Sequence, residues 1–213
     1  MKRVVILGGN GDGLVAAEVI RDLALAGEAV ELYGFLNDHQ DVGSFIEGWP
    51  VLGRTSDWQS LDDDVLFHFS LLSVGKMKER SELISSFAIP RERVISLIHP
   101  TAKVSSSCEV SAGVLITAYA VLQPGTKVGF GCSIRSGANL GHDVDVGEFC
   151  YVGPNATLCG YAKLGSGSYI APNAVVRDRT EVGDFAVLAA GSVAYKPLPE
   201  GSTWIGNPAR RAV

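Results

Sequence analysis

An aliphatic side chain recurs at every sixth position from Val104 to Leu188, without a slip or an insertion. The fifteen positions are Val104, Val110, Ile116, Leu122, Val128, Ile134, Leu140, Val146, Val152, Leu158, Leu164, Ile170, Val176, Val182 and Leu188. A period of six matches neither the repeat of an α-helix nor the alternation of a β-strand. It is typical of a hexapeptide β-helix, an all-β solenoid of short parallel strands whose interior the aliphatic residues fill.

The spacing of the glycines predicts how the hexads are arranged. A mostly small residue stands two positions before each aliphatic one, which lets the chain turn beside the filled interior. Four glycines each follow an aliphatic position and lie 18 residues apart: Gly129, Gly147, Gly165 and Gly183. Three hexads therefore make one coil, and fifteen make five. We expect the glycines to stack along one edge of a triangular prism.

Residues 1–98 show a different pattern, in which strands and helices alternate. Residues 2–8 predict a buried strand, a glycine-rich turn follows, and a helix is expected from Leu14 to about Leu25. A second strand is expected at 30–36, a strand and helix at 65–74 and 76–87, and a last strand at 94–98. Such βαβ units are parallel. We therefore expect a small, Rossmann-like α/β domain over residues 1–98.

The second domain is expected to span residues 99–213. His99-Pro100 marks its start, because the residue before a proline is disfavoured in helices and the hexads begin a few residues later. The period is expected to fail after Leu188. A loop, a short strand near Thr203–Ile205 and a tail should follow.

Composition excludes several function classes. The net charge of -5 and the pI near 5.4 provide no basic surface for a nucleic-acid backbone. The apolar run at the start is too short for a signal peptide or a membrane span, so we expect a cytoplasmic protein without membrane insertion. Cys108, Cys132 and Cys150 occupy small-residue positions, and we interpret them as buried apolar fillers rather than a disulfide or metal pair.

The turn Gly8–Gly13 is a candidate binding site for a nucleotide or a nucleotide-sugar. Its Gly11-Asp12-Gly13 segment does not fit the dinucleotide fingerprint, but such turns expose backbone amides to phosphate. The alternative is a tight turn without a ligand, and the Asp12 carboxylate would repel a pyrophosphate. Asn37 and Asp38 end the second predicted strand, where base or ribose is contacted in such folds. Gly75 follows the third strand and can line the same crevice.

His142 is the candidate catalytic base, because it is the only one of the four histidines inside the repeats. It follows Leu140-Gly141 at a corner and should point outward, with Asp143 beside it. The alternative is a solvated surface pair without a role. A hydrolytic metal site would need several histidine ligands, which a single repeat histidine does not supply, so no metal is expected.

Taken together, these features resemble one family. They are the glycine-rich βαβ domain, the His99-Pro100 boundary, the uninterrupted hexads, the run from Gly141 to Pro154, and the ending Trp204-Ile205-Gly206-Asn207-Pro208-Ala209-Arg210. The sequence is similar to sugar O-acyltransferases and N-acetyltransferases, which include sialic acid O-acetyltransferases and the bacillosamine-pathway N-acetyltransferases. The resemblance covers nearly the whole chain.

The resemblance implies a left-handed β-helix, a homotrimer, and active sites between neighbouring subunits that use acetyl-CoA. By this likeness His142 is the general base and Asp143 raises its basicity. Residues matching the nucleotide-sugar positions are Gly11, Asp12, Gly13, Asn37, Asp38 and Gly75. Residues matching the acetyl-CoA groove are Tyr151, Lys163, Pro172 and Ala190. The chain departs from the family at Asp12 and Tyr151, where histidine is usual, and at Arg135, where asparagine is often found.

Three functions follow as hypotheses. The first is an acetyl-CoA-dependent N-acetyltransferase of a nucleotide-linked amino sugar, with direct transfer and no acyl-enzyme. The second is O-acetylation of a sialic acid or a related sugar. The third is a non-catalytic trimeric scaffold that binds nucleotide-sugar, which the residues at 12, 135 and 151 keep open. Neither the nucleotide nor the sugar can be named from the sequence.

Overall fold

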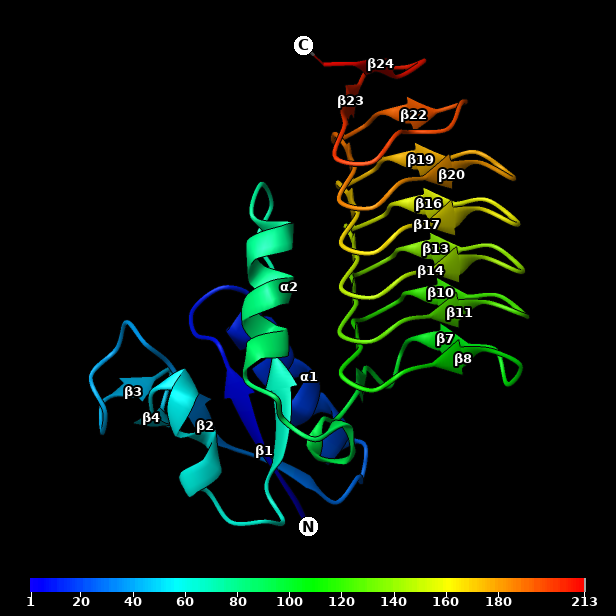
Figure 1. The fold of residues 1–213 in the computed structure, drawn as a ribbon. Helices are drawn as coiled ribbons and strands as arrows, with labels where there is room; N and C mark the ends of the chain where they lie inside the picture. The colour runs from blue at the N-terminus through cyan, green and yellow to red at the C-terminus, as the bar shows by residue number, and fades with distance from the viewer. Residues whose placement is uncertain (213) are drawn as a thin grey trace.

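A computed structural model describes residues 1–212. An α/β domain packs against the first coils of a long solenoid (Figure 1). The sheet of the α/β domain has the order β3-β4-β2-β1-β5, and only β3 is antiparallel to its neighbour. Its strands are β1 (Lys2–Leu7), β2 (Val30–Leu36), β3 (Phe45–Ile46), β4 (Trp49–Gly53) and β5 (Leu66–Phe69).

Two α-helices and two short 3-10 helices accompany this sheet. They are α1 (Asp12–Leu25), η1 (Thr55–Ser60), α2 (Met77–Ser86) and η2 (Arg91–Arg93). The buried side chains of α1, such as Val19 and Ile20, pack with Val4 and Ile6 of β1 in one apolar cluster. Neither α-helix of the described chain has the length and apolar character needed to cross a bilayer.

The predicted first strand, first helix and second strand are confirmed, with the helix beginning two residues earlier than expected. The third strand was predicted to run to Val74 but ends at Phe69, because its partner β1 ends at Leu7. The hairpin β3–β4 was not predicted. Glu47 and Gly48, both at positive φ, form its two-residue turn.

The segment 94–98 passes from one sheet to another instead of forming one strand. The Ile95 amide donates to Phe67 in the α/β sheet, whereas the Leu97 amide donates to Val114 in the solenoid, both at 2.9 Å. Only Leu97–Ile98 is a strand, β6, and it pairs with β9. The two parts of the molecule are therefore joined by a short, hydrogen-bonded connection.

The solenoid consists of two-residue strands that recur every six residues. They are β6 (Leu97–Ile98), β7 (Lys103–Val104), β8 (Glu109–Val110), β9 (Leu115–Ile116), β10 (Val121–Leu122), β11 (Lys127–Val128), β12 (Ser133–Ile134), β13 (Asn139–Leu140), β14 (Asp145–Val146), β15 (Tyr151–Val152), β16 (Thr157–Leu158), β17 (Lys163–Leu164), β18 (Tyr169–Ile170), β19 (Val175–Val176), β20 (Glu181–Val182), β21 (Val187–Leu188) and β22 (Val193–Ala194).

These strands stack in parallel into three sheets, which are the faces of the prism. The six-stranded sheet has the order β22-β19-β16-β13-β10-β7, and the five-stranded sheet has the order β20-β17-β14-β11-β8. The eight-stranded sheet, β24-β23-β21-β18-β15-β12-β9-β6, gains β23 (Thr203–Ile205) and, antiparallel to it, β24 (Arg210–Arg211) from the tail. Partners such as Leu122 and Leu140 are 18 residues apart, so the predicted coil of three hexads is confirmed.

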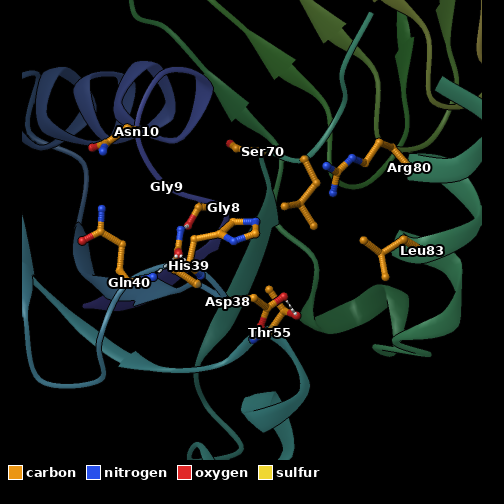
Figure 2. Close-up of a pocket in the computed structure, with 12 residues that line it drawn as sticks. Gly8, Gly9, Asn10, Asp38, His39, Gln40, Thr55, Ser70, Arg80 and Leu83 are labelled. Atoms are coloured by element: carbon orange, nitrogen blue, oxygen red, sulfur yellow. Dashed lines mark hydrogen bonds between the residues drawn. The ribbon is translucent and has the colours of Figure 1, made fainter. Parts of the chain in front are cut away.

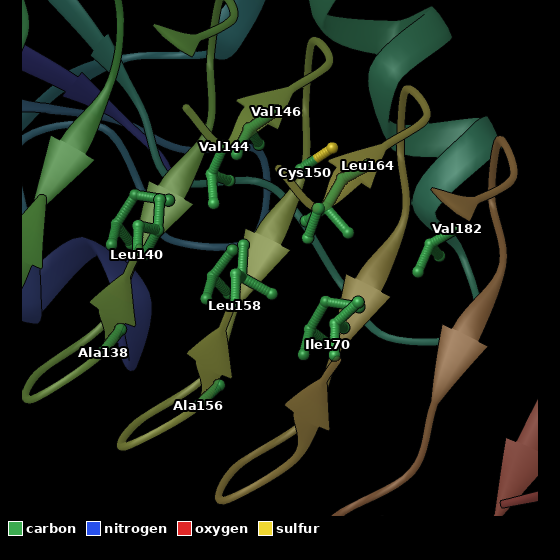
Figure 3. Packing of buried hydrophobic residues seen from close by; sticks show 14 of the residues in the cluster. Ala138, Leu140, Val144, Val146, Cys150, Ala156, Leu158, Leu164, Ile170 and Val182 are labelled. Atoms are coloured by element: carbon green, nitrogen blue, oxygen red, sulfur yellow. The ribbon is translucent and has the colours of Figure 1, made fainter. Parts of the chain in front are cut away.

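The aliphatic positions fill the interior in one continuous apolar cluster (Figure 3). The predicted glycine edge is also confirmed: a Cβ on Gly129 would lie 2.7 Å from the carbonyl carbon of Gly147 in the next coil. Of the three cysteines predicted as buried apolar fillers, Cys132 and Cys150 are buried, whereas Cys108 is only partly buried because it lies in the first coils. The prediction that the period fails after Leu188 was wrong by one hexad. Ala194 fills the next interior position, but alanine is too small to register in a pattern of large aliphatic residues.

Candidate active site

The turn between β13 and β14 carries His142 and Asp143 on the outer surface of the solenoid. Every sixth residue from Gly113 to Gly191 takes a positive φ at the corners, and Asp143 does so with a φ of 56°. The Asp143 amide donates to the carbonyl of Pro124, one coil earlier, at 3.0 Å. The preceding coil therefore fixes the backbone on which the pair stands.

The His142 and Asp143 side chains are joined through Nδ1 and Oδ2 at 2.9 Å, and each is about half exposed. A carboxylate that accepts the Nδ1 proton selects the tautomer in which Nε2 carries a free lone pair. The ring of Tyr161 meets the imidazole edge-on, with centroids 4.9 Å apart. The imidazole also lies close to Gly160, where a Cβ would come within 2.7 Å of Nε2. This arrangement can accept a proton at Nε2.

The α/β domain contains a cavity of about 350 Å³ beside the glycine-rich turn (Figure 2). The residues around it come from the turn after β1, the loop after β2, the start of η1, the segment after β5 and helix α2. They are Gly8, Gly9, Asn10, Asn37, Asp38, His39, Gln40, Thr55, Ser70, Leu71, Arg80 and Leu83. The cavity thus lies at the carboxyl ends of parallel strands, where open α/β sheets bind ligands.

Asn37 and Asp38 line this cavity, but their side chains are already hydrogen-bonded within the chain. Asn37 Oδ1 accepts from the His39 and Gln40 amides, and its Nδ2 donates to the Gly8 carbonyl at 2.8 Å. The Asp38 carboxylate accepts from the amide and the hydroxyl of Thr55, at 2.9 and 2.7 Å. These bonds shape the rim, and contact of either residue with a base or ribose stays a prediction.

The predicted Gly11-Asp12-Gly13 segment does not line this cavity. Gly11 precedes α1, and Gly13 is buried near the ring of Phe35. The Asp12 carboxylate accepts a hydrogen bond from Arg135 Nη1 at 3.0 Å. This ion pair offsets the charge that the sequence analysis expected to repel a pyrophosphate. Gly75 is exposed just before α2 and is also not among the lining residues.

Arg135 connects Asp12 to two tyrosines on the eight-stranded sheet. Its guanidinium lies 5.6 Å from the ring centroid of Tyr151, which stacks on Tyr169 at 4.7 Å and 7°. Burial raises the pKa of both phenols, so both remain protonated at neutral pH. The three departures from the family pattern, Asp12, Arg135 and Tyr151, therefore form one connected cluster between the α/β domain and the solenoid.

The four residues expected in the acetyl-CoA groove are not brought together within one chain. Pro172 and Ala190 lie in stacked turns between the eight-stranded and six-stranded sheets, whereas Tyr151 is in β15 of the eight-stranded sheet. Lys163 is in β17 of the five-stranded sheet, 3.8 Å from Glu181. It borders a groove of about 580 Å³ under the segment 197–200.

The His142 turn and the α/β cavity are also far apart. The turns that join the six-stranded to the five-stranded sheet lie on the side of the solenoid away from the α/β domain, which faces the eight-stranded sheet (Figure 1). Within one chain, therefore, the candidate base does not reach the candidate nucleotide-sugar cavity.

Sequence reasoning missed Tyr161, Tyr169, Ser70 and Arg80. The positions of the two tyrosines could have been predicted from the 18-residue coil. Tyr161 lies one coil after Asp143, and Tyr169 lies one coil after Tyr151. Arg80 stands between Met77 and Ile84, both buried on α2. An arginine on the inward face of a helix was the available signal.

Comparisons with known proteins identify the family. Residues 125–160 match the bacterial transferase hexapeptide family (six repeats). The acetyltransferase domain of PglB from Neisseria gonorrhoeae, solved in complex with acetyl coenzyme A, is 31% identical, with a TM-score of 0.86 over 99% of both chains. The chain belongs to the hexapeptide-repeat acetyltransferase family.

Other members of this family are also similar. A structure of PerB from Caulobacter crescentus in complex with CoA and GDP-perosamine is 26% identical, covers 99% of this chain and 97% of that one, and has a TM-score of 0.84. A variant of perosamine N-acetyltransferase from the same organism, with asparagine replacing a histidine, matches equally well with a TM-score of 0.84. UDP-N-acetylbacillosamine N-acetyltransferase of Bacillus subtilis is 33% identical over 121 residues, and the match covers 55% of this chain and about half, 52%, of that relative.

Metal ligands do not gather in the described part of the chain. Residues 1–212 contain no group of three or more histidine, cysteine, aspartate or glutamate side chains arranged to hold a metal ion.

Proposed function

We propose that this chain is an acetyl-CoA-dependent N-acetyltransferase that acts on a nucleotide-linked amino sugar. The observation that carries the proposal is the His142–Asp143 pair, 2.9 Å apart on an exposed corner of a family member's solenoid. Two relatives named above are sugar N-acetyltransferases, and one of them was solved with CoA and a nucleotide sugar.

The pair supports a direct transfer. The amino group of the acceptor approaches His142 Nε2, which takes the proton as the nitrogen attacks the thioester carbonyl. Asp143 holds Nδ1 and stabilises the imidazolium, which then returns the proton to the departing sulfur as the carbon–sulfur bond breaks, so that CoA leaves as a thiol. The proposed transfer uses no acyl-enzyme: His142 activates the acceptor directly, and Cys132 and Cys150 are fully buried in the solenoid.

The separation of the two half-sites supports a shared active site. We propose a homotrimer in which the His142 corner of one subunit lies against the Asp12–Arg135–Tyr151 cluster of the next. Acetyl-CoA would then lie between two solenoids, so that Lys163 of one copy and Tyr151, Pro172 and Ala190 of its neighbour can line one groove. This arrangement accounts for the distribution of the four residues over different faces.

The finer predictions from the sequence are part of the same proposal. Residues 1–98 form a Rossmann-like domain for the nucleotide-sugar, and residues 99–213 form a left-handed β-helix for acyl transfer. Asp12, Gly11, Gly13 and Gly75 contribute to acceptor binding across the subunit junction, and Asn37 and Asp38 shape the nucleotide cavity. The enzyme acts in the cytoplasm.

The test is a thiol-release assay. Acetyl-CoA is held constant against UDP-, GDP- and dTDP-linked 3-amino and 4-amino sugars, their hydroxyl analogues, and free sialic acid. We expect release with one amino sugar and none with its hydroxyl analogue. Release with sialic acid alone would replace N-acetylation by O-acetylation. Nucleotide-sugar binding without release across the panel would leave the chain as a scaffold and contradict the proposal.

A further inference from the structure

Arg80 enters the α/β cavity from helix α2 with its guanidinium directed toward the centre (Figure 2). Its Nε is buried and has no hydrogen-bond partner within residues 1–212. No ion pair in the described part of the chain includes Arg80. A cation and a donor are thus held inside a cavity without an internal anion.

Ser70 lies beside the same cavity, directly after β5. Its Oγ is also buried without a hydrogen-bond partner. Buried donors in folded proteins are nearly always satisfied, and the exceptions need an explanation such as a ligand. Two unsatisfied donors that line one cavity therefore point to a common acceptor that the protein chain itself does not supply.

The nearby carboxylates do not compete for this role. Asp38 is the only acidic residue among the lining residues, and Thr55 occupies both of its oxygens. Asp12 is paired with Arg135 and lines a different, smaller cavity, to which Ser70 also contributes. Asp38 therefore uses its oxygens on Thr55 and forms no ion pair with Arg80, whose guanidinium stays available to an anion.

The position of the cavity indicates which anion. Gly8, Gly9 and Asn10 form the wall next to the start of α1, whose N-terminus has no side-chain cap. Helix N-termini after glycine-rich turns bind phosphate through backbone amides. A guanidinium adds two parallel donors that match phosphate oxygens.

We propose that Arg80, assisted by Ser70, binds the diphosphate of the nucleotide-linked substrate. This inference rests on the proposed function and adds to it the residues that distinguish a nucleotide-linked sugar from the free sugar. The diphosphate would lie between α2 and the glycine-rich turn, with the sugar extending past Ser70 toward Asp12 and Arg135.

Calorimetric binding of UDP, GDP and dTDP, with the corresponding nucleosides, tests the proposal on the full chain. Arg80→Gln removes both the positive charge and the two parallel guanidinium donors, whereas Arg80→Lys keeps the charge. The control Lys78→Gln removes a charge from an exposed position of the same helix. We expect Arg80→Gln to weaken the best nucleoside diphosphate by about 10- to 100-fold, Arg80→Lys to weaken it less, and Lys78→Gln to change nothing. Nucleoside affinity should be the same in all variants.

Equal diphosphate affinity in the wild type and Arg80→Gln would overturn the proposal. So would an equal loss for the nucleoside, which would assign Arg80 to the shape of the cavity, or no binding of any diphosphate by the wild type. Acetyl transfer is measured separately on the same preparations. An Arg80-dependent diphosphate affinity without any transfer would reject the acetyltransferase and keep the anion site. Transfer with an unchanged KM in Arg80→Gln would reject the anion site alone.

Discussion

The solenoid and the α/β domain bury apolar side chains in opposite ways. In the solenoid each interior residue stacks on an equivalent residue 18 positions away, and one continuous cluster runs along its axis. In the α/β domain the two faces of one sheet make two separate clusters, with Ile6 on one side and Leu7 on the other. The solenoid repeats one packing arrangement in every coil, whereas the α/β domain packs helices and strands against each other without a repeat.

This difference explains where chemistry can arise. Repetition fills the solenoid interior with apolar side chains, so polar functional groups such as His142 lie at outward positions. The α/β domain contains loops of unequal length, which leave a cavity of about 350 Å³ at the strand ends. The Asp12–Arg135 pair connects the two regions. Four measurements test this division, in order of decreasing expected effect.

Replacement of His142 by asparagine should have the largest effect, because it removes the proposed general base. General base catalysis is typically worth about 10²- to 10⁴-fold, so we expect kcat for acetyl transfer to fall by this amount with acetyl-CoA binding unchanged. The matched control is Asp178→Asn, at the same corner two coils later. A nearly normal kcat in the His142 variant would show that His142 is not the catalytic base.

Leu158→Ala should cost about 2–5 kcal/mol of unfolding free energy, because a fully buried leucine leaves a cavity that the coils cannot close. Thr157→Ala, on the same strand but facing outward, should change it by less than about 1 kcal/mol. Urea denaturation followed by circular dichroism measures both. Similar losses for the two variants would mean that interior stacking does not dominate the stability of the solenoid.

His68 gives the α/β domain a pH dependence in the acid range. It is fully buried on β5, with Nδ1 donating to the Ile95 carbonyl at 3.1 Å, and desolvation lowers its pKa from 6.5 to about 4. Between these values the unfolded chain binds the extra proton. Stability from this group is therefore complete above pH 6.5 and decreases as the pH falls toward 4.

The expected loss from His68 between pH 7 and pH 5 is about 2 kcal/mol of unfolding free energy. His68→Gln keeps a polar side chain without this titration, so its stability should depend less on pH over the same interval. Denaturation curves at both pH values measure the difference. If the variant lost stability with pH as steeply as the wild type, the assignment to His68 would be wrong.

The Asp12–Arg135 pair should give the smallest effect. The Arg135 side chain is 11% exposed and Asp12 is 36% exposed, so solvent screens the pair in part and a coupling of about 0.5–2 kcal/mol is expected. A double-mutant cycle with Asp12→Asn and Arg135→Gln, followed by unfolding, measures this coupling. Additive effects would show that this pair does not couple the α/β domain to the solenoid.

Prediction from the sequence succeeded best where the chain repeats. Fifteen aliphatic positions defined the coil, the three faces and the inward thiols, because each position is tested again 18 residues later. The hairpin β3–β4 was missed because Phe45–Ile46 is too short for a pattern, and its turn residues Glu47 and Gly48 are a weak signal.

The candidate site shows the same limit. His142 and Asp143 are adjacent in sequence, so their contact could be predicted. Asp12 and Arg135 are 123 residues apart, and no local pattern relates them. Arg80 depends on how α2 is placed beside β5, which only the packing of the whole domain decides. Contacts between residues of the hexapeptide repeat were predictable, whereas contacts that depend on how helices, strands and coils pack together were not.

The 18-residue register also converts sequence length into height along the solenoid axis. Neighbouring strands are about 4.8 Å apart, so each coil raises the chain by one such step. An insertion or deletion of 18 residues would keep every interior position aliphatic and every residue on its own face, whereas six or twelve residues would keep the interior aliphatic but move all later residues to another face. An outward group such as Tyr161 therefore stands a whole number of steps above the α/β domain. A change in the reach between the two regions that keeps such a group on its own face therefore comes only in increments of one coil.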